Sequence, residues 1–120
     1  MILMRIISSI AVPSATPSVF TVTATSSTSI TVSWLLPPAN DRNGNITGFK
    51  LFYKKRVSAG QQTMVPVNSG SIWTKVFSGL EKYTEYEFQV LAYTSVGDGP
   101  NSSVIYRKTN EDGKKLIKQY

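Results

Sequence analysis

Apolar and polar residues alternate in short runs along most of the chain after Val19, and clusters of Ser, Asn, Gly and Pro separate these runs. Residues 20–25 alternate apolar side chains with threonine, and residues 30–34 continue the pattern up to Trp34. A period of two places every second side chain on one face of a β-strand, so both runs predict strands with one buried face. No run has the spacing of an amphipathic helix.

Turn-forming residues set the limits of the remaining strands. Pro37 and Pro38 cannot donate a backbone hydrogen bond and Asn43-Gly44 favours positive φ, so we expect a loop at residues 37–45. Further strands are predicted at residues 46–56, 61–67, 73–77, 86–93 and 103–109. Pro66 favours an edge position for its strand. This pattern predicts an all-β fold, a seven-stranded immunoglobulin-like antiparallel β-sandwich.

Two of these strands place an apolar and basic patch on one outer face of the predicted sandwich. If Phe49, Leu51 and Tyr53 point inward, the alternate side chains of both strands point outward. These candidate partner-binding residues are Lys50, Phe52, Lys54, Gln89, Leu91 and Tyr93. Aromatic patches rimmed by lysine are frequent on recognition surfaces, although scattered outward apolar residues also occur on sandwich faces that bind nothing.

Lys54, Lys55 and Arg56 form a basic run at the end of the third predicted strand. One interpretation is that the run extends the patch toward a sulfated glycan or an acidic partner. The simpler alternative is a solvated strand end.

The net charge of +6 adds little to this picture, because part of the excess lies near the chain ends. Arg5 precedes the predicted sandwich, and Lys114, Lys115 and Lys118 follow it. The predicted sandwich is only mildly basic, so we expect no nucleic-acid partner. No run approaches the ~20 apolar residues of a membrane span.

A length of 120 residues fits one domain. We expect residues 14–109 to form this domain, residues 1–13 to be a lead, tail or linker, and residues 110–120 to be a charged C-terminal linker or tail. The apolar start has no basic residue ahead of its apolar run, which favours a chain-end lead over a degraded secretory signal.

The composition removes most catalytic chemistry. The chain has no cysteine and no histidine, which excludes disulfides, thiolate nucleophiles and the most common general base and metal ligand. Its carboxylates show no metal-loop or acid–base pairing; Glu85 and Glu87, two apart, share one face of a strand. We therefore expect no catalytic site, no cofactor and no metal.

A set of motifs over about residues 14–109 resembles the fibronectin type III family. In chain order, the set comprises Pro17, Trp34, Pro37-Pro38, the strand 46–53, Gly79-Leu80, the strand 84–92, the turn 97–100 and Ser102. Gly79-Leu80 with the strand after it is the most specific part. The resemblance implies the same seven-stranded sandwich, in a family found in cell-surface adhesion molecules and receptors.

The resemblance also implies structural roles for Trp34, Leu80 and Tyr86. Leu80 and Tyr86 have the spacing of the tyrosine corner, in which a buried ring fills the core and its hydroxyl bonds to upstream backbone. Trp34 is expected in the core. The chain departs from the family at Lys82-Tyr83, where members often have a proline. Lys75 falls on the core side of its strand, so either its stem reaches the rim or the register is shifted.

Two N-glycosylation sequons, Asn45-Ile46-Thr47 and Asn101-Ser102-Ser103, lie in predicted loops, although such short motifs also arise by chance. In a sandwich of this type the two loops lie at one end, so glycans on both asparagines would crowd that pole. The turn 97–99 lacks the arginine of the Arg-Gly-Asp integrin motif that some family members carry there, and we expect no integrin binding by this loop.

These features predict a non-catalytic protein-interaction and spacer module of a multidomain extracellular or cell-surface adhesion or receptor protein, either secreted or single-pass. Its expected partners are a protein or neighbouring domains of the same chain, with weak binding of a sulfated glycan in addition. Two alternatives stay open. One is an intracellular structural module of a muscle or cytoskeletal array, and the other is an accessory domain of a larger enzyme.

Overall fold

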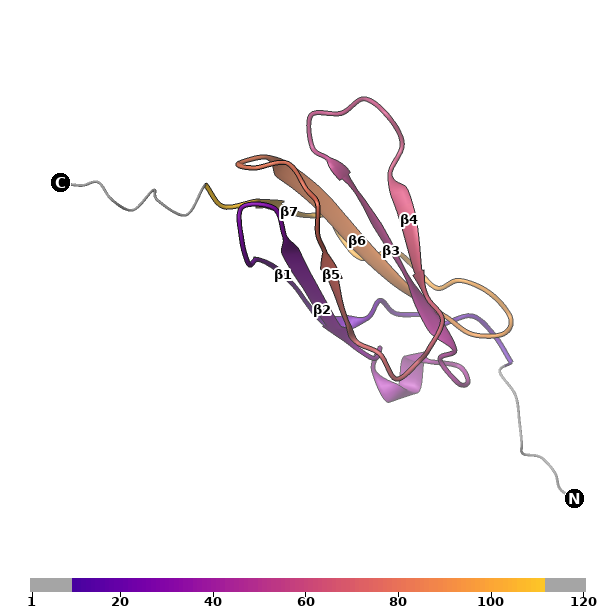
Figure 1. Cartoon of the computed structure of the whole chain (residues 1–120). Helices are drawn as coiled ribbons and strands as arrows, with labels where there is room; N and C mark the ends of the chain where they lie inside the picture. Colours follow the sequence, from indigo (N-terminus) through magenta and orange to yellow (C-terminus); the bar gives the residue numbers. More distant parts are fainter. Residues whose placement is uncertain (1–9, 112–120) are drawn as a thin grey trace, which may run out of the picture.

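The computed structural model describes residues 10–111, which form two antiparallel β-sheets packed face to face (Figure 1). The strands are β1 (Ser18–Ala24), β2 (Ile30–Leu35), β3 (Gly48–Lys55), β4 (Thr63–Val67), β5 (Thr74–Phe77), β6 (Glu85–Tyr93) and β7 (Ile105–Lys108), with one short 3-10 helix, η1 (Ala39–Asp41), after β2. The predicted seven-stranded sandwich is confirmed. The predicted tail charges at Arg5, Lys114, Lys115 and Lys118 lie outside the described residues.

The sheets have the strand orders β1-β2-β5 and β4-β3-β6-β7. β4 is an edge strand, as Pro66 predicted. β3 pairs with β6 along its whole length, from Gly48 opposite Tyr93 to Lys55 opposite Tyr86. Because directly opposite residues share a face of an antiparallel sheet, this register determines which side chains lie together.

The core takes every second side chain of the inner strands. Phe49 and Leu51 of β3 and Phe88 of β6 are completely buried, and Trp34 of β2 is 1% exposed. The rings of Trp34 and Phe49 pack edge to face, with 5.4 Å between their centroids. Burying each such side chain stabilises the fold by about 1.5–3 kcal/mol, so this alternation outweighs any other register.

Charged side chains protect two edge strands. Lys75 stands opposite the buried Val32, hence on the core side of β5, yet it is exposed because β5 is an edge. The predicted parity is therefore correct, and an inward charge on an edge strand hinders pairing with another chain. Arg107 of β7 also lies on the core side, and its Nε donates to the Val22 carbonyl of β1 at 2.8 Å, linking the two sheets.

The described chain enters and leaves at opposite ends of the sandwich (Figure 1). At one end the Ser14 N–H donates to the Asp41 carbonyl at 2.8 Å, and at the other the Asn110 N–H donates to the Ser26 carbonyl at 3.1 Å. The β2–β3, β4–β5 and β6–β7 connections lie at the first end, which we name the N-terminal pole. The other three connections lie at the C-terminal pole.

Gly48 begins β3 at a point where Tyr93 crosses it. A Cβ at this position would overlap the Tyr93 hydroxyl and lie 2.5 Å from the Val67 carbonyl oxygen. No real Cβ tolerates such contacts, so any other residue here displaces a ring or a neighbouring strand.

We predict that Gly48→Ala lowers the free energy of unfolding by about 1–3 kcal/mol, the usual cost of overpacking. Urea denaturation of the purified chain measures this loss. Gly60→Ala is the matched control, because a Cβ there meets only the Ser58 Oγ at 3.6 Å. Equal stability of the two variants would contradict the claim that the Tyr93 ring leaves no room for a Cβ at position 48.

Candidate protein-interaction site

The outer face of the four-stranded sheet carries the predicted partner-binding residues in adjacent rows. Phe52 of β3 stands between Met64 of β4 and Gln89 of β6. In the next row, Lys50 stands between Pro66 and Leu91. The exposed and half-exposed members of these rows, together with Tyr93, form what we name the outer-face patch: Lys50, Phe52, Met64, Pro66, Gln89 and Tyr93.

Met64 and Pro66 were missed at the sequence level. Met64 is 44% exposed and Pro66 is exposed, so both extend the patch to the sheet edge. Their alternation with the buried Val67 and the half-buried Val65 marks the outer face of β4. That signal was present in the sequence, but only the pairing of Met64 with Phe52 shows that both lie in one patch.

Leu91 offers no contact area, contrary to the prediction. It lies on the outer face opposite Lys50, as its parity requires, but it is only 5% exposed. β6 is an inner strand, so side chains of both neighbouring strands flank Leu91. The amine of the opposite Lys50 reaches along the sheet to Asp98. Alternation along a strand predicts on which face of the sheet a side chain lies, but not whether neighbouring side chains cover it.

Polar contacts hold three residues of the patch in place. The Gln89 Nε2 donates to the Ser102 carbonyl at 2.8 Å. The Tyr93 hydroxyl donates to the Asn68 Oδ1 at 2.9 Å. The Lys50 Nζ lies 3.0 Å from the Asp98 carboxylate and 5.7 Å from the centroid of the Tyr93 ring. Side chains already held in one conformation lose less entropy when a partner binds. This part of the patch is therefore pre-organised.

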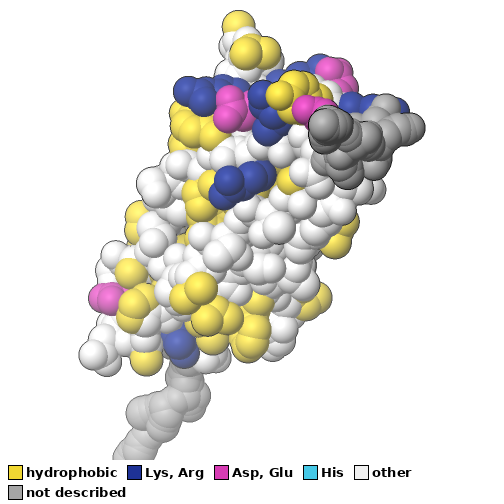
Figure 2. Space-filling model, turned by 90° about the vertical axis from the view of Figure 1, so that its left-hand side faces the viewer, with side chains coloured by type: hydrophobic (Ala, Val, Ile, Leu, Met, Phe, Trp, Pro, Cys, Tyr) yellow, Lys and Arg dark blue, Asp and Glu magenta, His cyan; other side chains and the backbone are white. Residues whose placement is uncertain are grey.

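The basic run at the end of β3 lies among acceptors and carboxylates. Figure 2 shows basic and acidic side chains gathered together toward the C-terminal pole. Lys54, Lys55 and Arg56 contact the Ser58 carbonyl, Glu81 and Glu85 respectively. A sulfated glycan would have to displace these contacts, so the arrangement favours a solvated strand end.

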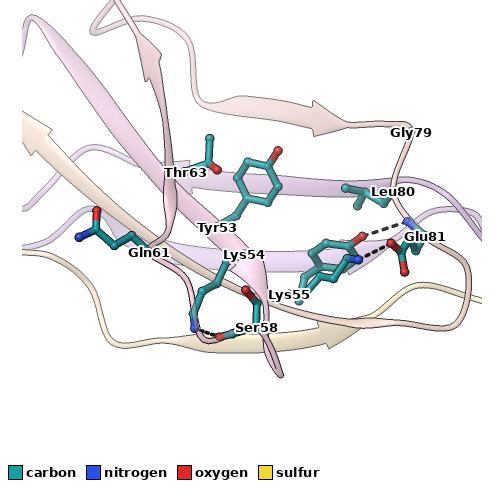
Figure 3. Close-up of a pocket in the computed structure, with 10 residues that line it drawn as sticks. Tyr53, Lys54, Lys55, Ser58, Gln61, Thr63, Gly79, Leu80 and Glu81 are labelled. Carbon is teal, nitrogen blue, oxygen red and sulfur yellow. Dashed lines mark hydrogen bonds and ion pairs between the residues drawn. The ribbon is translucent and has the colours of Figure 1, made fainter.

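A hollow of about 440 Å³ opens at the C-terminal pole between the β3–β4 hairpin and the β5–β6 connection (Figure 3). Tyr53 and Leu80 line it, and both also pack against the core. The Tyr53 ring lies 4.8 Å from the Phe77 ring, measured between centroids. The hollow is therefore the open end of the core, where the edge strands β4 and β5 do not pair.

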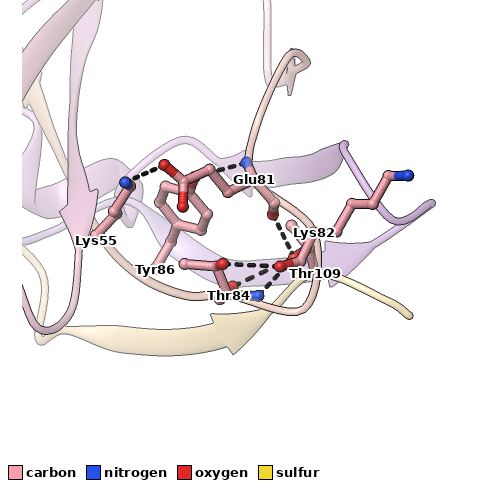
Figure 4. Close-up of polar contacts among 6 residues, drawn as sticks. All are labelled: Lys55, Glu81, Lys82, Thr84, Tyr86 and Thr109. Atoms are coloured by element: carbon pink, nitrogen blue, oxygen red, sulfur yellow. Dashed lines mark hydrogen bonds and ion pairs between the residues drawn. The ribbon is translucent and has the colours of Figure 1, made fainter. Parts of the chain in front are cut away.

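The tyrosine corner lies beside this hollow (Figure 4). Tyr86 is 4% exposed, and its hydroxyl accepts the Glu81 N–H at 2.9 Å. Thr109 braces the same connection, because its Oγ1 donates to the Glu81 carbonyl at 2.7 Å and accepts the Thr84 N–H at 2.9 Å. Tyr83, at the position of departure from the family, has a φ of 48°. These hydrogen bonds hold a turn that lacks the rigidity of a proline.

The segment upstream of β1 packs on the N-terminal pole. The Asn43 Nδ2 donates to the Val12 carbonyl at 2.9 Å, and the Thr94 Oγ1 donates to the Ala11 carbonyl at 2.8 Å. Pro13 is fully buried beside Gly99, where an added Cβ would lie 2.8 Å from the proline Cβ. The packed structure thus begins upstream of residue 14, and two loops hold it.

Both sequon asparagines are exposed at this pole, Asn45 in the β2–β3 loop and Asn101 in the β6–β7 loop. A second hollow, of about 280 Å³, lies between the β2–β3 and β4–β5 loops, and Asn45 is part of its lining.

Within residues 10–111, no group of three or more acidic, cysteine or histidine side chains is placed to hold a metal ion. In the same range, no helix has the length and apolar character needed to cross a membrane.

The sandwich, its strand order and the tyrosine corner together define an immunoglobulin-like β-sandwich module. Residues 15–108 match the model of the fibronectin type III domain, and the chain belongs to this family.

Its relatives include large receptors. The chain is 45% identical over 105 residues to the tyrosine-protein phosphatase Lar of Drosophila melanogaster and 42% identical over 102 residues to the netrin receptor DCC of Homo sapiens. Each match covers 84% of this chain but only 5% and 7% of the respective relative. The chain therefore corresponds to a small part of these relatives, and its homologues are cell-surface receptors and adhesion proteins that contain fibronectin type III domains.

Solved structures show the same fold. The FN1–FN3 domains of chicken CNTN1 superpose with a TM-score of 0.70 at 26% identity, over 83% of this chain and 32% of that one. The third fibronectin III domain of human KIAA0343 protein gives a TM-score of 0.75 at 23% identity, over 90% of this chain and 91% of that one.

We predict that Tyr86→Phe lowers the free energy of unfolding by about 1–3 kcal/mol, because the Glu81 N–H loses its acceptor in a part-buried position. Chemical denaturation measures the change. Tyr83→Phe is the matched control, since its ring is 57% exposed, and it should cost less than about 0.5 kcal/mol. A Tyr86→Phe variant as stable as the control would contradict the bracing role of the hydroxyl.

The hydrogen bond to Glu81 raises the pKa of Lys55 above its ordinary value of 10.5. A raised pKa in the folded state means that the contact stabilises the fold below that ordinary value and that this contribution is lost as the pH rises through the raised pKa. We predict that Glu81→Gln lowers the pKa of Lys55, measured by NMR titration of its side chain. Glu85→Gln, which removes the partner of Arg56 instead, should leave it unchanged.

Proposed function

We propose that this domain is a protein-interaction and spacer module in the extracellular part of a secreted or single-pass cell-surface protein. The outer-face patch is the observation that carries the contact role. It combines the aromatic Phe52 with the exposed Met64 and Pro66 on one sheet face, beside a lysine. Aromatic residues and methionine are enriched at protein interfaces, and rigid aromatic rings add contact area there at low entropic cost.

The placement of the chain ends supports the spacer role. The described chain enters at the N-terminal pole and leaves at the C-terminal pole, so neighbouring domains of one chain would follow each other along the long axis of the sandwich (Figure 1). Hydrogen bonds tie both ends to loops, through Ser14 at one pole and Asn110 at the other. Ends held in this way limit the swing of an attached domain.

The relatives support the extracellular location, and they show that two of the alternatives are compatible. The tyrosine-protein phosphatase Lar is both an enzyme and a relative of this chain, so a cell-surface module and an accessory domain of an enzyme need not exclude each other. The intracellular structural alternative differs, because its sequons would never meet glycosylating enzymes. Use of the sequons therefore separates the two locations.

We predict that a fluorescent streptavidin tetramer of the biotinylated 120-residue chain binds intact cultured cells saturably and that Phe52→Glu reduces this binding about tenfold or more. A charge at the centre of the patch cannot be desolvated against an apolar partner surface without losing at least ~1.4 kcal/mol. Flow cytometry over a panel of cell lines measures the effect.

Thr31→Glu is the matched control, because Thr31 of β2 lies on the outer face of the other sheet, opposite Thr23 and Val76. Binding that Thr31→Glu abolishes and Phe52→Glu leaves intact would move the contact surface to the other sheet. Absence of saturable binding from every cell line would refute the contact role and leave only the spacer role.

A further inference from the structure

The hollow at the N-terminal pole is lined in part by Asn45, the asparagine of the first sequon. The β2–β3 loop forms one side of the hollow, and Gly70 and Ser71 of the β4–β5 loop form the other. Its volume of about 280 Å³ is near the lower limit of ligand pockets, roughly 300 Å³. It has room for one ring-sized group.

The lining combines apolar and donor groups. Leu36 and Ile46 are both half-buried and pack against the core. Arg42 is the cationic member of the lining, and its Nε donates to the Pro37 carbonyl at 2.7 Å. A guanidinium carries five N–H donors in a fixed plane, so this contact uses one donor and positions the others.

Arg42 has no ion pair among the residues that the structure describes. Its remaining N–H donors can bind an oxygen acceptor, whether a neutral carbonyl or an anionic oxygen. The adjoining aliphatic surface favours the C–H face of a ring. An N-acetylhexosamine supplies the acceptor and the apolar ring face, because its acetamido carbonyl accepts hydrogen bonds and one face of its pyranose ring is apolar.

We propose that Asn45 carries an N-linked glycan and that the first N-acetylglucosamine of this glycan lies in the hollow, with its ring against Leu36 and Ile46 and its acetamido oxygen on Arg42. This inference rests on the extracellular location proposed above. The sugar need not diffuse to its site, since the covalent bond to Asn45 holds it beside the hollow at high effective concentration.

The position of the glycan connects it to the spacer role. Asn43, two residues before Asn45, donates to the Val12 carbonyl of the upstream segment. A sugar packed across the β2–β3 and β4–β5 loops restrains the loop that holds this segment. The glycan therefore strengthens the attachment of whatever precedes the domain.

Asn101 is an internal control. It is exposed at the same pole, but it lines neither of the two hollows described above. A glycan there has only its covalent bond to the protein and should move freely. The two sequon asparagines of one chain thus differ in whether a hollow lies beside them to hold the first sugar.

The experiment uses the 120-residue chain secreted from mammalian cells behind a heterologous signal peptide. Peptide N-glycosidase cleaves the bond between asparagine and the first sugar and leaves aspartate, so mass spectrometry of peptides gives the release rate at each site. We expect release from the native protein about tenfold slower at Asn45 than at Asn101, because the packed sugar must first leave the hollow. In denatured protein, the two rates should be equal within a factor of about two.

Arg42→Gln should bring native release at Asn45 close to the rate at Asn101. Because Arg42→Gln also loses the hydrogen bond to the Pro37 carbonyl, a second measurement uses variants that keep Arg42. Asn45→Gln should lower the thermal midpoint of the secreted protein by ~4 °C, whereas Asn101→Gln should lower it by less than about 1 °C. The same two variants made in bacteria, without glycans, give the cost of each side chain alone, and the loss at Asn45 in the secreted protein should exceed its bacterial value by ~4 °C.

The possible failures are distinguishable. Secretion with neither asparagine modified would overturn both the glycan and the argument for an extracellular location. Modification of Asn101 alone would overturn the glycan at Asn45 while the extracellular location stands. Modification of both with equal native release rates and equal midpoints would overturn the packing of the sugar and nothing else.

Discussion

The pairing of β3 with β6 determines where every candidate surface of this domain lies. These strands run opposite each other from Gly48 and Tyr93 to Lys55 and Tyr86. A shift of one residue would exchange the inner and outer faces of a strand and expose the rings that now fill the core. Burial of Phe49 and Phe88 therefore also places Phe52 on the outside. The contact surface is a consequence of the core.

The same framework places different features at the two ends of the long axis. The C-terminal pole holds ion pairs such as Arg56 with Glu85, and the tyrosine corner lies there. The N-terminal pole holds the upstream segment, both sequons and the hollow beside Asn45. The braced turn at one pole and a proposed glycan at the other leave the sheet faces as the surfaces open to a protein partner. The outer-face patch lies on one of them.

Membership of the fibronectin type III family explains the fold but does not name the partner. The match to this chain covers 5% of the phosphatase Lar and 7% of the netrin receptor DCC, so relatives with quite different activities share the domain. Function in such a module depends on side chains that the core leaves free to vary. The patch around Phe52 and the Arg42 side chain in the hollow lie outside the buried core.

The sequence by itself determined the strands, the inward positions of Trp34 and Tyr86 and the parity of Lys75, because a period of two depends only on neighbours along one chain. Only the tertiary structure showed that Leu91 is covered, because its cover comes from neighbouring strands. It also placed Met64 beside Phe52, packed Pro13 on the pole, and opened a hollow next to Asn45. Each of these features brings together residues from different strands or loops, and the pattern along one strand does not predict how far apart such residues lie.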